Sequence, residues 1–105
     1  MEATIQTNNT TNPVMVYSKS YCPFCDKTKK LFGSMGVTPK VIELDKIADG
    51  DKMQATLAKL TGQRTVPNVF VGGKHLGGND DTHSKHRTGE LTKMLESAGV
   101  TTKPE

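Results

Sequence analysis

The chain's only two cysteines, Cys22 and Cys25, lie in the run Tyr-Cys-Pro-Phe-Cys at residues 21–25. A short apolar run, residues 14–17, precedes them, and a segment with helical periodicity follows. Pro23 suits the first position of that helix, because its ring fixes a helical φ and it has no NH to leave unpaired. A cysteine at a helix N-terminus has its thiolate stabilised by free backbone NH groups and by the helix dipole. The pair therefore predicts a redox-active dithiol, with Cys22 as the attacking sulfur and Cys25 as the resolving one.

Lysines flank this dithiol on both sides in the sequence. Positive charge close to a sulfur favours its anionic form, so we expect these side chains to promote a thiolate at Cys22. The residues concerned are Lys19, Lys27, Lys29 and Lys30.

Two other interpretations of the cysteine pair are less favoured. A Cys-x-x-Cys pair supplies half of many zinc sites, but the closely paired His83 and His86 lie too far along the chain from Cys25 for a compact zinc module. Two inert buried thiols are disfavoured because Pro23 and the neighbouring lysines place the pair at the start of a helix. No metal is therefore expected.

Length and composition bound the remaining possibilities. A chain of 105 residues forms one domain, and the absence of Trp predicts a core built mainly from Val, Ile, Leu and Met. No apolar run is long enough to span a membrane, and the first residues lack the pattern of a signal peptide. Two cysteines arranged for exchange suit a reducing compartment, so we expect a soluble, cytoplasmic protein. The net charge of +3, with no basic run among aromatics, does not predict nucleic-acid binding.

The order of predicted elements indicates the fold class. Residues 1–12 are rich in Thr and Asn and are expected to be a flexible N-terminal tail; residues 13–100 form the domain and 101–105 a C-terminal tail. A strand, a helix and a strand in succession favour a parallel pair, and a Gly-Gly turn favours a hairpin. We therefore predict an α/β domain with a mixed four-stranded sheet flanked by helices. The expected elements are a strand at 14–17, a helix from 23, a strand at 40–44, a helix between 49 and 62, a hairpin at 69–76 and a last helix at 91–98.

Three motifs together give the chain a family resemblance. The Cys-Pro-Phe-Cys dithiol, Thr65-Val66-Pro67 and the run Gly-Gly-Asn-Asp-Asp at 77–81 resemble, in order, the motifs of dithiol glutaredoxins, over roughly residues 14–98. The resemblance implies a thioredoxin-like fold. Phe24 departs from the pattern, because many members carry Tyr there; a hydroxyl beside the dithiol is lost and apolar cover is kept. Thioredoxins, with Trp-Cys-Gly-Pro-Cys, and monothiol relatives, with Ser in place of the second cysteine, are less similar.

The resemblance also implies a glutathione site beside the dithiol. It implies a cis peptide bond before Pro67, with the Val66 backbone offered to a peptide-like ligand. Free NH groups at a helix start bind a carboxylate, and a carboxylate side chain accepts from an ammonium group. By resemblance, Asp80 and Asp81 hold the γ-glutamyl end of glutathione; the alternative, in which Asn79 or Asp80 only caps the last helix, stays open. The residues expected to bind glutathione are Lys19, Phe24, Gln63, Thr65, Val66, Pro67, Gly78, Asn79, Asp80 and Asp81, with Lys19 and Gln63 at the glycyl carboxylate.

The expected activity is glutathione-dependent thiol–disulfide exchange. The resemblance implies a monomeric electron-transport enzyme that reduces protein–glutathione mixed disulfides and protein disulfides, with glutathione as reducing co-substrate and glutathione reductase as an indirect partner. Cys22 attacks the glutathione sulfur, and either a second glutathione or Cys25 then frees Cys22. Two alternatives remain. One is an iron–sulfur carrier, which Pro23 disfavours because cluster-binding relatives often have Gly there; the other is a thioredoxin-like reductase served by a flavoenzyme.

Overall fold

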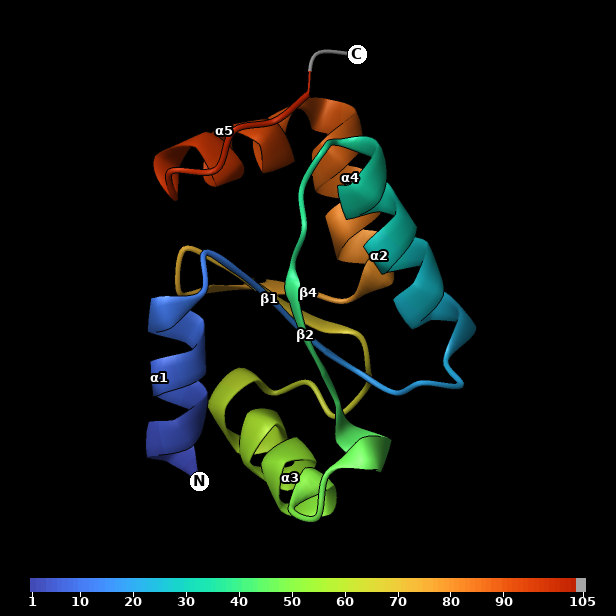
Figure 1. Cartoon of the computed structure of the whole chain (residues 1–105), viewed down its shortest axis with the longest axis vertical. Helices are drawn as coiled ribbons and strands as arrows, with labels where there is room; N and C mark the ends of the chain where they lie inside the picture. Colours follow the sequence, from blue (N-terminus) through green and yellow to red (C-terminus); the bar gives the residue numbers. More distant parts are fainter. Residues whose placement is uncertain (104–105) are drawn as a thin grey trace.

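A computed structural model describes residues 1–103 of the chain. One four-stranded mixed sheet, in the order β2-β1-β3-β4, is covered by helices on both faces, so the predicted fold class is confirmed (Figure 1). Along the chain the elements are α1 (Glu2–Thr11), β1 (Val14–Ser18), α2 (Pro23–Ser34), β2 (Lys40–Glu43), the 3₁₀ turn η1 (Leu44–Lys46), α3 (Gly50–Thr61), β3 (Asn68–Val71), β4 (Lys74–Gly77), α4 (Asn79–Thr88) and α5 (Glu90–Ser97).

The strand pairings follow from the connections between the strands. β1 and β2, joined through α2, are parallel, whereas β1 and β3 are antiparallel. Gly72 and Gly73, with φ of +59° and +80°, make the tight turn between β3 and β4, as predicted. The dithiol follows the end of the central strand β1.

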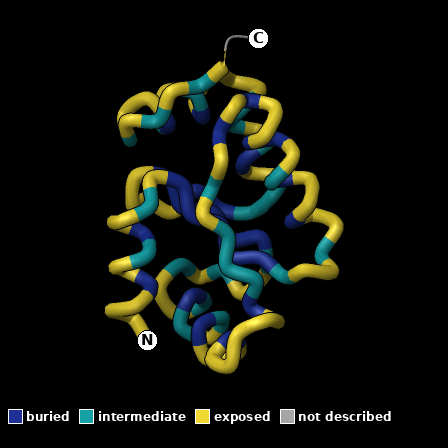
Figure 2. The backbone as a smooth tube through the Cα atoms, in the orientation of Figure 1, coloured by how far each residue is buried: buried dark blue, intermediate teal, exposed yellow. Residues whose placement is uncertain are grey.

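Alternate residues of β1 face opposite layers of the core. Val14 and Val16 pack with Phe32 of α2 and Leu95 of α5, and Met15 and Tyr17 belong to a second cluster that includes residues of α1 and α3. All five residues of β1 are buried, and Figure 2 shows buried backbone concentrated in the strands, with exposed positions on the outer helix faces. β1 is thus fixed on both sides, which gives the loop at its end a rigid base.

The prediction of a flexible tail at residues 1–12 is wrong, because Glu2–Thr11 form helix α1. One side chain per turn attaches this helix to the domain: Ile5 is 0% exposed, and Asn9 is buried beside the strand. Tyr17 Oη donates a hydrogen bond to Asn9 Oδ1 at 2.7 Å. The sequence does not predict this helix, because only two of its residues face the domain and they are too few to produce a recognisable helical pattern of apolar residues.

The C-terminal part of the chain also differs from expectation. The predicted last helix, α5, is preceded by a separate helix, α4. Gly89, at φ +82°, ends α4 and separates it from α5. Leu60, in the last turn of α3, is exposed. In the predicted tail at 101–105, the Lys103 NH donates to the Met35 carbonyl at 2.7 Å, while residues 104–105 lie outside the described residues. Among the described helices, none has the length and apolarity required to cross a membrane.

Candidate active site

The dithiol begins helix α2 as the sequence predicts. Cys22 is the N-cap, with extended backbone, and Pro23 occupies the first helical position. The backbone NH of Cys25 donates a hydrogen bond to Cys22 Sγ at 3.2 Å. Cys22 therefore takes the place that Ser or Asp occupies in ordinary helix caps, where NH donors stabilise a negative charge.

The two sulfurs lie in different environments. Cys22 is partly exposed, whereas Cys25 is 0% exposed beneath it. Burial raises the pKa of the Cys25 thiol to about 11, and its hydrogen bond with Cys22 adds to this effect. Cys22 is thus the sulfur that an incoming disulfide can reach, and Cys25 is protonated at neutral pH.

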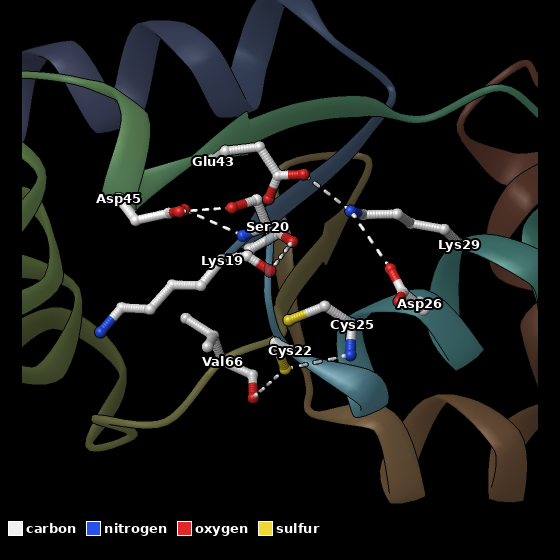
Figure 3. A network of polar contacts seen from close by, with 10 residues as sticks. Lys19, Ser20, Cys22, Cys25, Asp26, Lys29, Glu43, Asp45 and Val66 are labelled. Atoms are coloured by element: carbon white, nitrogen blue, oxygen red, sulfur yellow. Dashed lines mark hydrogen bonds and ion pairs between the residues drawn. The ribbon is translucent and has the colours of Figure 1, made fainter.

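A loop before β3 lies opposite Cys22. The peptide bond between Val66 and Pro67 is cis, as the resemblance implied. The Cys22 thiol contacts the Val66 carbonyl oxygen at 3.8 Å, a contact drawn in Figure 3. Gln63 Nε2 donates to the carbonyls of Thr65, at 3.0 Å, and Pro67, at 2.9 Å. Gln63 therefore holds the shape of the loop that faces the attacking sulfur.

Beside this loop lies a cavity of about 380 Å³, which is in the size range of small-ligand sites. It joins the dithiol helix, the loop before β3 and the start of α4. Its lining contains every residue of the predicted glutathione set except Lys19, whose amine points away from Cys22 and Cys25 in Figure 3. The lining residues are Phe24, Gln63, Thr65, Val66, Pro67, Gly78, Asn79, Asp80 and Asp81.

The start of α4 is organised by Asp81. Its Oδ2 accepts a hydrogen bond from the Gly78 NH at 3.2 Å, so the cap of this helix is made by Asp81 rather than by Asn79 or Asp80. Gly77 passes so close to this carboxylate that a Cβ there would lie 2.2 Å from Asp81 Oδ2. This close approach requires glycine at residue 77. Asp80 and Asp81 are both exposed, and both line the cavity.

Two of the flanking lysines already have partners within the protein. Lys29 Nζ lies 2.8 Å from Glu43 Oε2 and 3.9 Å from Asp26 Oδ1, so its charge is already paired. Lys27 Nζ lies over the ring of Phe24, 5.3 Å from the centroid. The charge of Lys29 is thus offset by two carboxylates, and the expected effect of the lysines on Cys22 stays a prediction.

Several supporting residues escaped the sequence analysis. Thr28 Oγ1, fully buried on α2, donates to Asn79 Oδ1 at 2.9 Å and orients a residue of the cavity. The Ser20 NH donates to Asp45 Oδ1 at 2.9 Å, and the Ser20 hydroxyl binds the same carboxylate. These bonds from Ser20 hold the pKa of Asp45 below its usual range. Isolated Ser, Thr and Asp residues form no periodic pattern in the sequence, so their positions near the site become apparent only in the folded structure.

A dithiol at a helix start, facing a cis-proline loop at the end of a mixed sheet, defines a thiol–disulfide oxidoreductase of the thioredoxin-like class. Comparison with known proteins narrows the class. The family model described as Glutaredoxin matches residues 14–76. The chain is 59% identical over 88 residues to Glutaredoxin-C6 of Oryza sativa subsp. japonica, covering 84% of this chain and 79% of that protein. It is 54% identical over 89 residues to a glutaredoxin of Ricinus communis, covering 85% and 87%.

Solved structures agree with the sequence comparisons. The crystal structure of a buckwheat glutaredoxin–glutathione complex has a TM-score of 0.92 and 49% sequence identity, covering 94% of this chain and 90% of that one. A wheat glutaredoxin has a TM-score of 0.90 and 51% identity, covering 93% and 92%. The chain therefore belongs to the glutaredoxin family. Its activity is glutathione-dependent thiol–disulfide exchange through a dithiol site.

Proposed function

We propose that this protein reduces mixed disulfides between proteins and glutathione, with Cys22 as the nucleophile and the cavity as the glutathione-binding site. The observation that carries the proposal is the position of the cavity, whose wall is formed by Phe24 of the dithiol helix and by the cis-proline loop that Cys22 contacts. A similar protein from buckwheat was crystallised as a complex with glutathione. The motifs that line the cavity here are those on which the resemblance rests.

The cavity offers complementary groups to a tripeptide with two carboxylates and one ammonium. The N-terminus of α4 presents backbone NH groups and a positive dipole end to the α-carboxylate of the γ-glutamyl residue. The carboxylates of Asp80 and Asp81 lie at the same edge and suit its ammonium group. The backbone of Val66, whose carbonyl oxygen the Cys22 thiol contacts, suits the cysteinyl part, which brings the glutathione sulfur toward Cys22.

The reaction is a pair of thiol–disulfide exchanges. Cys22 thiolate attacks the glutathione sulfur of the mixed disulfide, and the protein thiol leaves as a thiolate that takes a proton from solvent. Cys22 is then joined to glutathione. A second glutathione thiolate releases oxidised glutathione, or Cys25 attacks Cys22 and releases glutathione. The partial exposure of Cys22 and the burial of Cys25 support this order of attack.

The test is NADPH oxidation coupled through glutathione and glutathione reductase, with a glutathionylated peptide as substrate. We expect Cys22→Ser to abolish turnover and Cys25→Ser to retain a good part of it. Turnover that persists in Cys22→Ser would overturn the assignment of the nucleophile. Turnover supported by thioredoxin reductase and not by glutathione would overturn the choice of reductant.

Two further features belong to the proposal. A cysteine pair built for exchange suits a reducing compartment, so we place the protein in the cytoplasm as a monomer; cell fractionation and light scattering test these points. The described residues contain no cluster of three or more His, Cys, Asp or Glu side chains placed to hold a metal ion. A cluster held by Cys22 and glutathione from two subunits would not need such a group, so that alternative stays a prediction. Colourless protein after anaerobic purification with iron and glutathione would contradict it.

A further inference from the structure

Gln63 uses both hydrogens of its side-chain amide on the loop that faces Cys22. Its Nε2 donates hydrogen bonds to the Thr65 carbonyl at 3.0 Å and to the Pro67 carbonyl at 2.9 Å. A primary amide has two N–H donors, so both are taken. Val66, between these two residues, has its carbonyl oxygen 3.8 Å from the Cys22 sulfur. The position of the Val66 backbone therefore depends on how Gln63 is held.

The start of α4 lies close to the same amide. A Cβ placed on Gly78 would lie 3.7 Å from Gln63 Nε2 and 3.6 Å from the Pro67 carbonyl oxygen, both ordinary contact distances. Gly78 and Gln63 both line the cavity. The amide thus lies where the loop before β3 meets the helix start that suits the γ-glutamyl carboxylate, so its position affects both walls of the site.

Thr61, the last residue of α3, holds the backbone of Gln63. Its Oγ1 donates to the Leu57 carbonyl one turn earlier, at 2.7 Å, and accepts a hydrogen bond from the Gln63 NH at 3.0 Å. Nδ2 of Asn68, which is buried and follows Pro67, lies 3.5 Å from the same oxygen. One hydroxyl at the end of α3 therefore contacts residues on both sides of the loop, and Thr61 lies outside the lining of the cavity.

We infer that Thr61 is a positioning residue of the glutathione site, which acts on the ligand through Gln63 and the loop. This inference rests on the proposed function, because it concerns the wall that glutathione meets. The hydroxyl fixes the Gln63 backbone, and the Gln63 amide then fixes the carbonyls on either side of Val66. The loop is thereby ordered before the ligand arrives, so less conformational freedom is lost on binding.

The first test compares two threonines of helix α3. Thr61→Val removes the hydroxyl and keeps the shape of the side chain. The matched control is Thr56→Val, because the Thr56 hydroxyl likewise donates to the carbonyl one turn earlier, that of Lys52 at 2.9 Å, and this bond stays within the helix. We expect Thr61→Val to lower kcat/KM for a glutathionylated peptide by about three- to tenfold, mainly through KM, and Thr56→Val to leave it unchanged. Thr61→Ser keeps the hydroxyl and should recover most of the loss.

Amide hydrogen exchange, followed by NMR in the full chain, measures the inferred link without any substrate. The Gln63 NH is bonded to Thr61 Oγ1, so Thr61→Val should speed its exchange by at least about tenfold while the amides of β3 keep their wild-type rates. Unchanged exchange at Gln63 would overturn the inference. Alkylation of Cys22 by iodoacetamide, which needs no cavity, should keep the wild-type rate. A parallel loss there would place the effect on the nucleophile and overturn the inference as well.

Gln63→Met keeps the length of the side chain and removes both donors, so it tests the route from Thr61 to the ligand. If Thr61 acts through Gln63, adding Thr61→Val to Gln63→Met should lower kcat/KM much less than Thr61→Val does alone. Fully additive losses would contradict that route. Peptide joined to γ-glutamylcysteine, which lacks the glycyl carboxylate, should show the same fold loss in both single variants as the glutathionylated peptide. A Gln63→Met loss that disappears with γ-glutamylcysteine would place Gln63 on the glycyl carboxylate and overturn the inference.

A third substrate separates this inference from the proposed function. The same peptide in a mixed disulfide with free cysteine has neither the γ-glutamyl nor the glycyl part of glutathione. If the wild type turns over the cysteinylated and glutathionylated peptides with equal kcat/KM, the proposed glutathione site fails and this inference fails with it. If the wild type prefers the glutathionylated peptide and Thr61→Val keeps that preference in full, the inference alone fails.

Discussion

The buried hydroxyl of Thr28 donates a hydrogen bond to Asn79 Oδ1 at 2.9 Å and so joins the dithiol helix to the first residue of α4. Thr28 lies on α2 one turn beyond Cys25, and Asn79 lines the cavity. The two parts of the proposed site, the sulfurs and the helix start that suits glutathione, are therefore linked directly by a side-chain hydrogen bond.

Thr28→Val keeps the shape of the side chain and removes its donor. We expect it to lower the free energy of unfolding by about 1–2 kcal/mol, since the oxygen of Asn79 loses a buried partner. The KM for a glutathionylated peptide should rise several-fold with a smaller change in kcat, because Asn79 moves and Cys22 does not. Steady-state kinetics and urea denaturation measure the two effects.

The matched control for this prediction is Thr56→Val on α3. Thr56 Oγ1 donates only to the Lys52 carbonyl of its own helix, at 2.9 Å, so the change should alter neither KM nor stability appreciably. A Thr28→Val protein with the KM of the wild type would show that the contact does not position the cavity.

Helix α1 is attached by few side chains, and Ile5 is the main one. Ile5→Ala should cost about 2–5 kcal/mol of unfolding free energy, the range for removing a buried aliphatic side chain. Gln6→Ala, at an exposed position of the same helix, should cost little. Denaturant midpoints compare the two, and equal midpoints would mean that α1 contributes nothing to global stability. Activity of the folded Ile5→Ala protein should be preserved.

The features that could be predicted from the sequence are those with a local or periodic signal. The dithiol at a helix start is encoded by Cys22 and Pro23, and the hairpin by Gly72-Gly73, each within a few residues. Helix α1 was missed because its attachment uses only Ile5 and Asn9, separated by polar residues. The break at Gly89 was missed because a glycine within polar sequence can end a helix or merely interrupt it.

The residues behind the dithiol could not be predicted for a different reason. The sequence presents Lys29 as one of several positive charges near Cys22, but the parallel pairing of β1 and β2 brings Glu43 to it. Contacts between residues far apart in the sequence depend on strand register, which a single sequence does not specify.

Stability should fall at alkaline pH because two buried groups resist ionisation. Burial raises the pKa of Tyr17 from 10.0 to about 12, and burial with the Cys22 hydrogen bond raises the pKa of Cys25 from 9.0 to about 11. Above pH 9 the unfolded chain loses these protons and the native state keeps them, so the unfolded state binds fewer protons and the free energy of unfolding decreases as pH rises. The loss should run from about pH 9 to 11 for Cys25 and from about pH 10 to 12 for Tyr17.

Tyr17→Phe removes one of these groups and tests whether its ionisation lowers the free energy of unfolding at alkaline pH. The variant should be less stable at neutral pH by about 1 kcal/mol, because Asn9 loses its partner, but its stability should fall less steeply above pH 10. Urea denaturation under a non-thiol reductant across pH 7 to 11 measures the slope. Tyr21→Phe, at an exposed position, should keep the wild-type slope. An identical slope in Tyr17→Phe would contradict the assignment of alkaline sensitivity to this hydroxyl.

The close passage of Gly77 beside Asp81 allows a sharp comparison between two glycines. A Cβ at Gly77 would lie 2.2 Å from Asp81 Oδ2 and 2.8 Å from Asp81 Cβ, and its φ of +130° suits only glycine. Gly77→Ala must therefore displace the carboxylate that caps α4 at the Gly78 NH. We expect a loss of about 1–3 kcal/mol in stability and a KM for the glutathionylated peptide raised at least about tenfold.

Gly33 provides the opposite case, because a Cβ there meets nothing within 4 Å and the residue lies in helix α2. Gly33→Ala should raise the unfolding free energy by about 0.5–1 kcal/mol and leave KM unchanged, since alanine loses less conformational freedom in a helix. Thermal melts and steady-state kinetics on both variants give the comparison. Since the strain at Gly77 acts on the carboxylate, Gly77→Ala combined with Asp81→Ala should recover part of the lost stability but none of the substrate affinity. A double variant no more stable than Gly77→Ala would show that the strain comes from the backbone at Gly77 and from the Cβ of residue 81 rather than from the carboxylate.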